Sequence, residues 1–199
     1  MLNSPHNPAG SVLTPEDIRA LVDLVDGTRI LILSDEVYEH IIFDGLQHES
    51  CARHDALARR AFIVGSFGKT YHTTGWKVGY TVAPAALTTE FRKVHQFVTF
   101  STNTPVQHAI ADFLETRRGL DALGPFFQAK RDLFLRLMQE SRLRPLACRG
   151  SYFQLMDYSA ITDEADADFA IRLTKERGVA AIPTSPFLRA QTAPRVLRL

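Results

Sequence analysis

Fully apolar runs alternate with amphipathic segments along the first 120 residues. Residues 30–33 are apolar throughout, and so are residues 61–65 apart from the final Gly65. Such continuous runs are typical of parallel strands buried on both faces. Residues 78–83 form a third buried strand that ends at a proline. Because helical patterns lie between these runs, the sequence predicts an α/β layer with a mostly parallel sheet.

Three helices are predicted in this part of the chain. Thr14 and the proline after it suit a helix start, and apolar residues recur at helical spacing from Ile18 to Val25 before Gly27. A second apolar stripe, over residues 87–98, predicts another helix. Thr104 and Gln107 have the spacing of a capping box and begin the third helix.

The pattern changes after residue 120. A helix is predicted after Gly124-Pro125, to about residue 141, with Leu133, Leu137 and Met138 facing inward. Strands are expected at residues 152–157, 179–182 and 195–199, and a helix over 166–177 that ends at Gly178. We therefore predict part of a large domain over 1–120, a linking helix over 121–142 and a partial small α+β domain over 143–199. The last strand reads as cut off midway, so we expect the chain to be part of a longer protein.

Composition narrows the function classes. The chain has 199 residues, of which 45% are hydrophobic and 23% charged, and its net charge of +1 gives no sign of a nucleic-acid or anionic-membrane partner. Its apolar runs are far shorter than the roughly 18 residues that span a bilayer. Neither the two cysteines nor the seven histidines show metal-ligand spacing. These features predict a cytoplasmic protein with no membrane partner and no metal.

Two residues with the chemistry of a carbonyl-cofactor site follow predicted strands. Lys69 lies just after the second run, where partial burial and a nearby cation, Lys77, keep an amine neutral for part of the time. Such an amine can hold pyridoxal 5'-phosphate as a Schiff base. Asp35 ends the first run, at the edge where open α/β sheets bind ligands, and its carboxylate suits a pyridine nitrogen. Taken alone, however, Lys69 is better explained as a surface lysine, and Asp35 equally well as a turn residue.

Four further residues suit the rest of such a site. Tyr38 could reach the phenolic oxygen of the ring, while Ser66 and Lys77 supply a hydroxyl and a cation for a phosphate. Arg198 stands among apolar neighbours in the last strand, and an arginine fork suits a substrate carboxylate. Each has an ordinary alternative: an amphipathic tyrosine, a strand-end hydroxyl, a surface cation and an edge-strand charge.

Four motifs in this order resemble one enzyme family. They are Asn7-Pro8-Ala9-Gly10, Asp35-x-x-Tyr38, Ser66-x-x-Lys69 and Gly75-Trp76-Lys77-Val78-Gly79-Tyr80. Together they resemble the fold-type-I, class I and II aminotransferases, which use pyridoxal 5'-phosphate. The lysine after Gly-Trp is similar to the branch of methionine, glutamine and kynurenine aminotransferases, bacterial methionine aminotransferases included.

The resemblance implies a role for each residue. Lys69 would carry the cofactor, Asn7 and Tyr38 would bind its phenolic oxygen, and Asp35 its ring nitrogen. Ser66 and Lys77 would bind its phosphate, and Arg198 the substrate carboxylate. The implied activity is ping-pong transfer of an amino group from an L-amino acid (methionine, glutamine, aromatic or kynurenine-like) to a 2-oxo acid, in a homodimer. In the family, a front half absent from these 199 residues supplies a phosphate loop and a ring-stacking aromatic.

Three alternatives stay open at this point. The chain could be an inactive truncated aminotransferase, or its residues could serve a β-lyase that acts on cysteine conjugates. The segment from Gly65 to Thr70 also imitates the end of a nucleotide-binding P-loop, although Ile63 stands where the first glycine of that motif belongs.

Overall fold

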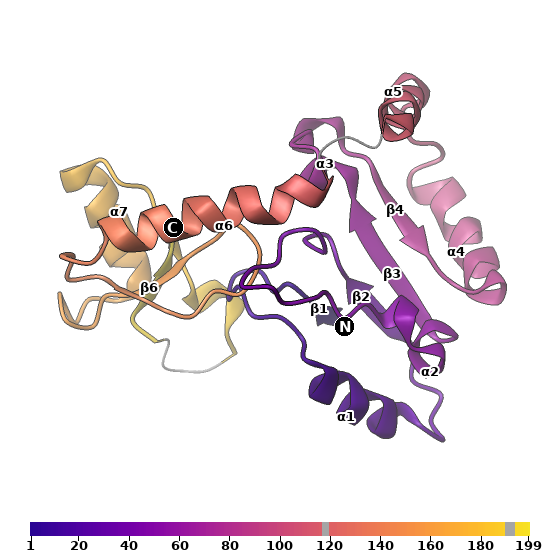
Figure 1. The fold of residues 1–199 in the computed structure, drawn as a ribbon, viewed down its shortest axis with the longest axis horizontal. Helices are drawn as coiled ribbons and strands as arrows, with labels where there is room; N and C mark the ends of the chain where they lie inside the picture. The colour runs from indigo at the N-terminus through magenta and orange to yellow at the C-terminus, as the bar shows by residue number, and fades with distance from the viewer. Residues whose placement is uncertain (117–119, 190–193) are drawn as a thin grey trace.

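The computed structural model describes residues 1–116, 120–189 and 194–199. Within these residues, two four-stranded sheets are joined through helix α6 (Leu120–Leu137), which runs along one side of the molecule (Figure 1). The strand order is β1-β2-β3-β4 in the first sheet and β5-β6-β8-β7 in the second. The predicted α/β class is confirmed, while the domain boundaries at residues 120 and 142 stay a prediction.

The first sheet is parallel except at one edge. Strands β1 (Leu2–Asn3), β2 (Ile32–Asp35) and β3 (Ala61–Ser66) run parallel, but β4 (Gly79–Val82) is antiparallel to β3. The strand predicted over residues 78–83 is present as β4, but its predicted burial within the parallel layer was wrong, because β4 is antiparallel to β3 and mostly exposed. Between β3 and β4 lie only short turns, α3 (Phe67–Thr70) and η2 (Thr74–Trp76), so no helix carries the chain back across the sheet.

Only one face of β2 is buried, which corrects the prediction of a strand buried on both faces. Ile32 and Ser34 are buried, whereas Leu31 and Leu33 are 57% and 41% exposed. A strand covered on one face alternates in burial, because successive side chains point to opposite faces. Helices α1 (Pro15–Val25) and α2 (Asp55–Ala58), with turn η1 (Cys51–Arg53), cover the buried face.

Helix α1 begins where the sequence predicts. The Thr14 hydroxyl accepts from the Asp17 backbone N–H, and the Asp17 carboxylate accepts from the Thr14 N–H at 2.8 Å. This reciprocal capping satisfies two donors that a helix start leaves unpaired. Ile18 and Val25 are buried against the first sheet, in a cluster that also contains Ile32, Cys51, Leu57, Ala61 and Ile63.

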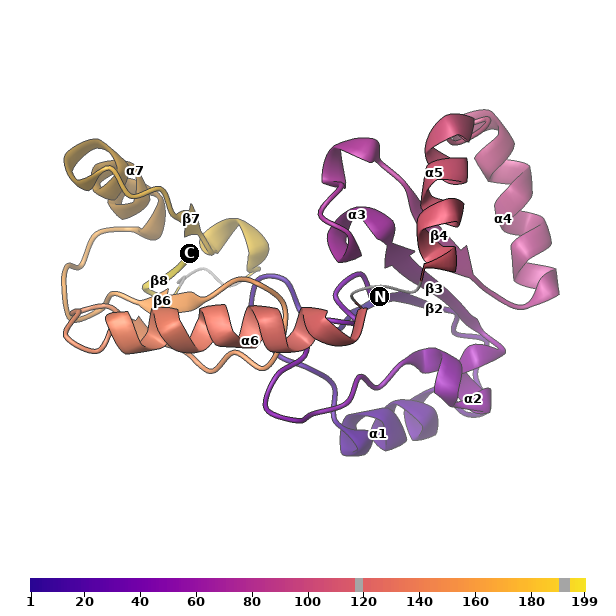
Figure 2. The same cartoon turned by 45° about the horizontal axis from the view of Figure 1, so that its top comes forward.

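Helices α4 (Ala85–Val98) and α5 (Thr104–Glu115) lie on the other side of this sheet (Figure 2). Phe91 of α4 contacts Phe62, with ring centroids 6.3 Å apart. The predicted helix is present as α4, but it buries none of its residues, and Val98 is 78% exposed. The capping box predicted at Thr104 was wrong: Asn103 caps α5 by accepting from the Val106 N–H at 3.1 Å.

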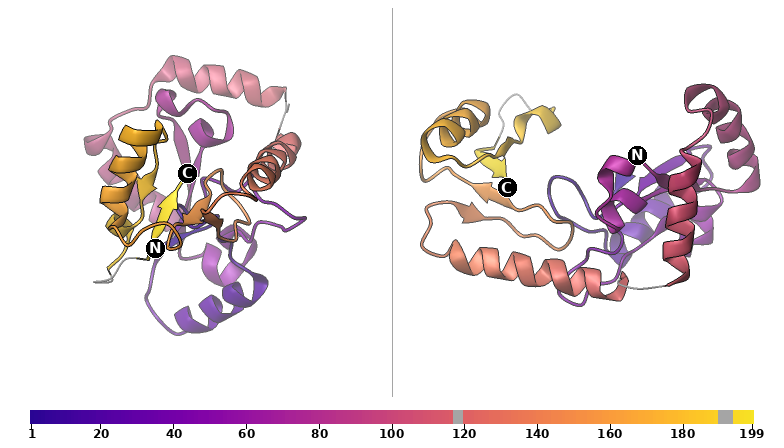
Figure 3. Two further views of the ribbon diagram at one scale, coloured as in Figure 1. Left: turned by 90° about the vertical axis from the view of Figure 1, so that its left-hand side faces the viewer. Right: turned by 90° about the horizontal axis from the view of Figure 1, so that it is seen from above.

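Helix α6 is buried only in its first turns. It contains Pro125 instead of starting there, and its buried residues are Leu123 and Gly124. A Cβ at Gly124 would lie 3.2 Å from the Ile42 carbonyl oxygen, so the small residue permits this close approach. Leu133 and Leu137, predicted to face inward, are 44% and 72% exposed, since α6 extends past the first sheet along one side (Figure 3).

The second sheet is antiparallel throughout, and its strands are shorter than predicted. It consists of β5 (Arg144–Pro145), β6 (Leu155–Asp157), β8 (Val196–Arg198) and β7 (Ile182–Pro183), near turn η3 (Ser185–Phe187). Helix α7 (Asp166–Arg177) ends as predicted at Gly178, which has a left-handed φ of 68°. The last strand lies between β6 and β7, so Arg198 is on an inner strand and not on an edge. Across the described ranges, no helix has the length and apolar character to span a membrane.

Candidate active site

The carboxyl ends of the three parallel strands meet at one edge of the first sheet. Asn3 ends β1 and pairs in register with Asp35 at the end of β2, and β3 ends at Ser66. The Asn3 side-chain amide donates to the Asp35 backbone carbonyl at 3.0 Å, and its oxygen accepts from the Asn7 N–H at 2.8 Å. Asn3 thus fixes the loop that carries Asn7 against the end of β2.

A cavity of about 770 Å³ opens at this edge. It brings together four of the seven predicted site residues, Asn7, Asp35, Tyr38 and Lys69, although they are separated by as many as 62 positions in the chain. The remaining lining residues are Met1, Leu2, Asn3, His6, Leu13 and Val37. Ser66, Lys77 and Arg198 do not line this cavity.

Lys69 reaches the cavity from the single turn α3. The Ser66 hydroxyl accepts from the Lys69 backbone N–H at 3.3 Å, which caps this turn and fixes the start of the lysine side chain. The Lys69 amine donates to the Tyr152 hydroxyl at 3.2 Å and lies 5.8 Å from the centroid of the Tyr38 ring. Its side chain is half-buried, in line with the expected partial burial.

Tyr38 is almost fully buried at the cavity wall. It is 2% exposed, and its ring packs edge-on against Tyr152 and Phe153 at centroid distances of 5.3 and 5.9 Å. Burial first, and the neighbouring Tyr152 hydroxyl second, raise the pKa of Tyr38 above its ordinary value. The Tyr38 phenol therefore stays protonated, and able to donate a hydrogen bond, throughout the neutral range.

Arg198 connects the second sheet to the cavity. Its guanidinium donates to the Asn7 side-chain oxygen at 2.6 Å, across 191 positions of sequence. The same guanidinium lies 4.2 Å from the centroid of the Phe153 ring. Asn7 lines the cavity, so this hydrogen bond places a forked cation beside its rim.

Ser66 and Lys77 are less closely gathered. Ser66 precedes Lys69 by one turn and caps α3, whereas Lys77 is exposed and follows η2 with a left-handed φ of 56°. Among the described residues, Lys77 does not line the cavity. Its predicted role toward a phosphate stays a prediction.

Sequence reasoning missed two residues of this site, Asn3 and Tyr152. Asn3 stands two residues from the start of the chain, and only the register of β1 against β2 reveals its contact with Asp35. Tyr152 is 83 positions from Lys69, so no local spacing links the two. The available signal was the aromatic pair in the Gly150-Ser151-Tyr152-Phe153 segment, at the start of the strand predicted over residues 152–157.

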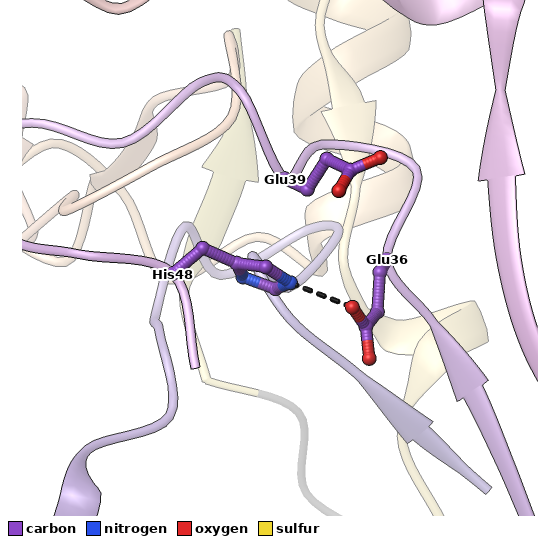
Figure 4. Close-up of side chains that lie close together, drawn as sticks. All are labelled: Glu36, Glu39 and His48. Atoms are coloured by element: carbon purple, nitrogen blue, oxygen red, sulfur yellow. Dashed lines mark hydrogen bonds and ion pairs between the residues drawn. The ribbon is translucent and has the colours of Figure 1, made fainter. Parts of the chain in front are cut away.

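Spacing also failed to reveal a cluster of potential metal ligands. Among the described residues, Glu36, Glu39 and His48 place ligand atoms within 4.8 Å of one another (Figure 4). The oxygens of Glu36 are already engaged, because they accept from the Ser34 hydroxyl at 2.8 Å and the Cys51 N–H at 3.0 Å and contact His48 Nε2 at 2.8 Å. This arrangement explains the cluster as a buried anchor for the loop over residues 40–52.

Comparisons with known proteins agree with this geometry. The model of the family "Aminotransferase class I and II" matches residues 1–199. A methionine aminotransferase of Escherichia coli is 49% identical over 200 residues, which cover 100% of this chain and 52% of that protein. A kynurenine–oxoglutarate transaminase of Dictyostelium discoideum is 36% identical, over 94% of this chain and 48% of that protein.

Solved structures give the same result. The crystal structure of the Escherichia coli methionine aminotransferase superposes with a TM-score of 0.96 at 49% identity, covering 100% of this chain and 53% of that one. An N-succinyldiaminopimelate aminotransferase of Mycobacterium tuberculosis gives a TM-score of 0.93 at 31% identity, covering 100% of this chain and 52% of the other. The chain spans about half the length of the curated relatives it matches.

This chain belongs to the class I and II aminotransferase family, and its fold is that of the fold-type-I members. The proteins it most resembles among those above include an enzyme that acts as a methionine aminotransferase. Members of the family depend on pyridoxal 5'-phosphate. The family match also removes the nucleotide-hydrolase alternative, since the lysine motif is accounted for by a different chemistry.

Proposed function

We propose that this chain carries the cofactor-holding part of a pyridoxal-phosphate-dependent aminotransferase, which moves an amino group from an L-amino acid to a 2-oxo acid. One observation supports this most strongly: the Lys69 amine, the Asp35 carboxylate and the Tyr38 phenol all line one cavity at the strand ends. An amine, an acid and a hydrogen-bond donor are the groups that such a cofactor requires.

The residues present fit the cofactor chemically. The Lys69 amine suits its aldehyde, Asp35 its ring nitrogen, and the Tyr38 phenol and Asn7 amide its phenolic oxygen. Ser66 and Lys77 would hold its phosphate by a hydroxyl and a charge. When bound, the cofactor supplies an electron sink for the bond that breaks at the substrate's α-carbon.

The chain's own groups would orient the substrate and move its proton. Arg198 has five donors, of which one is engaged with Asn7, so its fork can still bind a carboxylate. Lys69, when its amine is free, would act as general base on the proton of the substrate's α-carbon and, as general acid, deliver it to C4′ of the cofactor. The Asp35 carboxylate would pair with the ring nitrogen and favour its protonated form.

Three features of this proposal do not rest on the geometry of the site. We infer a homodimer, a cytoplasmic location, and amino donors such as methionine, glutamine, aromatic residues or kynurenine. The names of relatives that act on methionine and on kynurenine support this range of donors. The paired oxo-acid product, and not pyruvate with ammonia, is expected because the proposal is for transfer and not β-elimination.

The test is covalent trapping. The purified chain is mixed with pyridoxal 5'-phosphate, its visible absorbance is recorded, and borohydride reduction is followed by peptide mapping. We expect the label on Lys69, its loss in Lys69→Ala, and no change in Lys93→Ala, whose lysine is exposed on α4 and paired with Glu90. Donors and several oxo acids are then assayed, with products identified by mass spectrometry.

The outcomes separate the alternatives. Label on Lys69 with formation of oxo acid supports the proposal, and pyruvate with ammonia from a cysteine conjugate would replace it by the β-lyase. Label without turnover would identify an inactive portion that still holds the cofactor. A folded chain that takes no label would overturn the proposal for this chain.

A further inference from the structure

We propose that Tyr152 is a positioning residue for the reactive amine, a role that rests on the proposed function of Lys69. The Lys69 amine donates to the Tyr152 hydroxyl at 3.2 Å and lies 5.8 Å from the centroid of the Tyr152 ring. The two residues come from different parts of the fold, since Lys69 follows β3 and Tyr152 precedes β6.

The backbone on the N-terminal side of Tyr152 is held tightly in place. Ser151 is fully buried with a left-handed φ of 67°, and its N–H donates to the Ile41 carbonyl at 2.9 Å. Gly150 forms an isolated bridge with Ile42, and a Cβ there would lie 2.8 Å from the Ile41 carbonyl oxygen and 2.9 Å from Pro5. Strained, close-packed backbone of this kind persists where its surroundings determine it, and it often accompanies function.

The ring of Tyr152 is then held by three aromatic neighbours. Tyr38 packs edge-on at 5.3 Å, Phe127 lies at 5.5 Å, and Phe153 at 4.7 Å between ring centroids. The residue is still 37% exposed, and its hydroxyl meets the Lys69 amine, which lines the cavity. A rigid ring that presents one oxygen contrasts with lysine, whose four-carbon stem is flexible.

Positioning follows from this contrast in stiffness. The Tyr152 oxygen accepts a hydrogen from the amine, which leaves the nitrogen's lone pair free and restricts where the amine sits. Attachment of an aldehyde cofactor forms a bond between the Lys69 nitrogen and the aldehyde carbon, and the aldehyde oxygen leaves as water. An amine already held beside the cavity reacts faster, because less orientational freedom is lost in that step.

The experiment compares Tyr152→Phe with Tyr71→Phe in the 199-residue chain. Tyr71 stacks on Phe67 two residues from Lys69, and it serves as the matched loss of a tyrosine hydroxyl. We expect Tyr152→Phe to slow attachment of pyridoxal 5'-phosphate about three- to tenfold, the range that one net hydrogen bond supplies. Tyr152→Phe should bind pyridoxine 5'-phosphate, which has no aldehyde, with the affinity of the wild type. Tyr71→Phe should match the wild type both in the rate of attachment and in this affinity.

A second measurement needs no cofactor. Acetic anhydride labels the lysines of the cofactor-free chain, and peptide mass spectrometry compares Lys69 with Lys93 as an internal reference. Tyr152→Phe should label Lys69 about two- to fivefold faster, because an amine that is no longer restricted beside the cavity can turn toward the solvent, where the reagent meets it. Attachment and labelling thus change in opposite directions, which a general loosening of the fold would not produce.

Each outcome has one meaning. Wild-type attachment rates in Tyr152→Phe, or weaker binding of pyridoxine 5'-phosphate, would overturn the positioning role. A wild-type chain that never attaches the cofactor would overturn the proposed function. In that case the labelling comparison still decides whether Tyr152 holds the Lys69 amine, and equal labelling of the two chains would refute it.

Discussion

The buried carboxylate of Glu36 offers a sharp test of how the loop over residues 40–52 is held in place. Its side chain is 3% exposed and contacts three partners: the Ser34 hydroxyl at 2.8 Å, the Cys51 N–H at 3.0 Å and His48 Nε2 at 2.8 Å. Replacement by leucine would leave the Cys51 N–H and the Ser34 hydroxyl buried without this acceptor. Each unsatisfied buried group costs about 1–3 kcal/mol, so Glu36→Leu should lower the free energy of unfolding by about 2–6 kcal/mol.

Glutamine is the matched replacement. Glu36→Gln keeps one side-chain oxygen for Ser34 and Cys51 and loses mainly the charge-assisted contact with His48, at a cost of about 1–2 kcal/mol. The free energy of unfolding of each variant is measured by urea unfolding. The signal is the fluorescence of Trp76, the single tryptophan, which lies in η2 next to the first sheet. Glu90→Gln, at an exposed carboxylate of α4, should stay within about 0.5 kcal/mol of the wild type.

The same carboxylate predicts a pH dependence. Burial opposes its ionisation, but hydrogen bonds from His48, Ser34 and the Cys51 backbone outweigh burial and hold the pKa of Glu36 below its ordinary value of 4.5. A lowered carboxyl pKa stabilises the folded state above the unfolded pKa, and the stabilisation is lost as the pH falls through the folded pKa. The gap between wild type and Glu36→Gln should therefore be full near neutral pH and shrink below pH 4.5. Equal stability of the leucine and glutamine variants, or a gap that persists in acid, would refute this reasoning.

Two further changes have clear expected outcomes. Gly65→Ala would place a Cβ 2.1 Å from the Tyr80 ring and should lower the melting temperature. Gly75→Ala, whose added Cβ would have no atom within 4 Å, should leave the melting temperature unchanged. Equal shifts in the two variants would contradict the packing of β3 against β4. Asp44→Asn would break the bidentate pair in which Arg131 donates at 2.8 and 2.6 Å, yet asparagine tolerates the left-handed backbone at this position. Because the Asp44 side chain is 49% exposed, a loss of only about 0.5–1 kcal/mol is expected, and a loss of the same size in 1 M salt would exclude an ion pair as its cause.

Local signals in the sequence predicted those parts of the fold that local interactions determine. The cap at Thr14 and the glycine that ends α7 depend on residues within one helical turn, and both appear where they were predicted. Burial could not be predicted in the same way. The run before Ser34 has the pattern of a strand buried on both faces, but the described residues cover one face only, and α4 buries none of its apolar stripe.

The candidate site also has a part that the sequence could predict and a part that it could not. Lys69, Asp35 and Tyr38 follow strand ends, and strand topology alone brings strand ends to one edge, so the sequence predicted their meeting at one cavity. The contacts of Arg198 with Asn7 and of Tyr152 with Lys69 join the second sheet to the first across 191 and 83 positions. Such contacts depend on how two packed units meet, and no spacing rule within one segment encodes that.

The left-handed backbone at Lys77 sets up a trade-off between stability and chemistry at that position. A φ of 56° suits glycine or asparagine, and a non-glycine residue there costs on the order of 1 kcal/mol or more. A search for stabilising substitutions would therefore favour Lys77→Gly and, under the proposed function, would remove a phosphate-binding cation at the same time. Variants selected only for a higher melting temperature should drift toward small residues at position 77, and selection for cofactor retention should restore the cation.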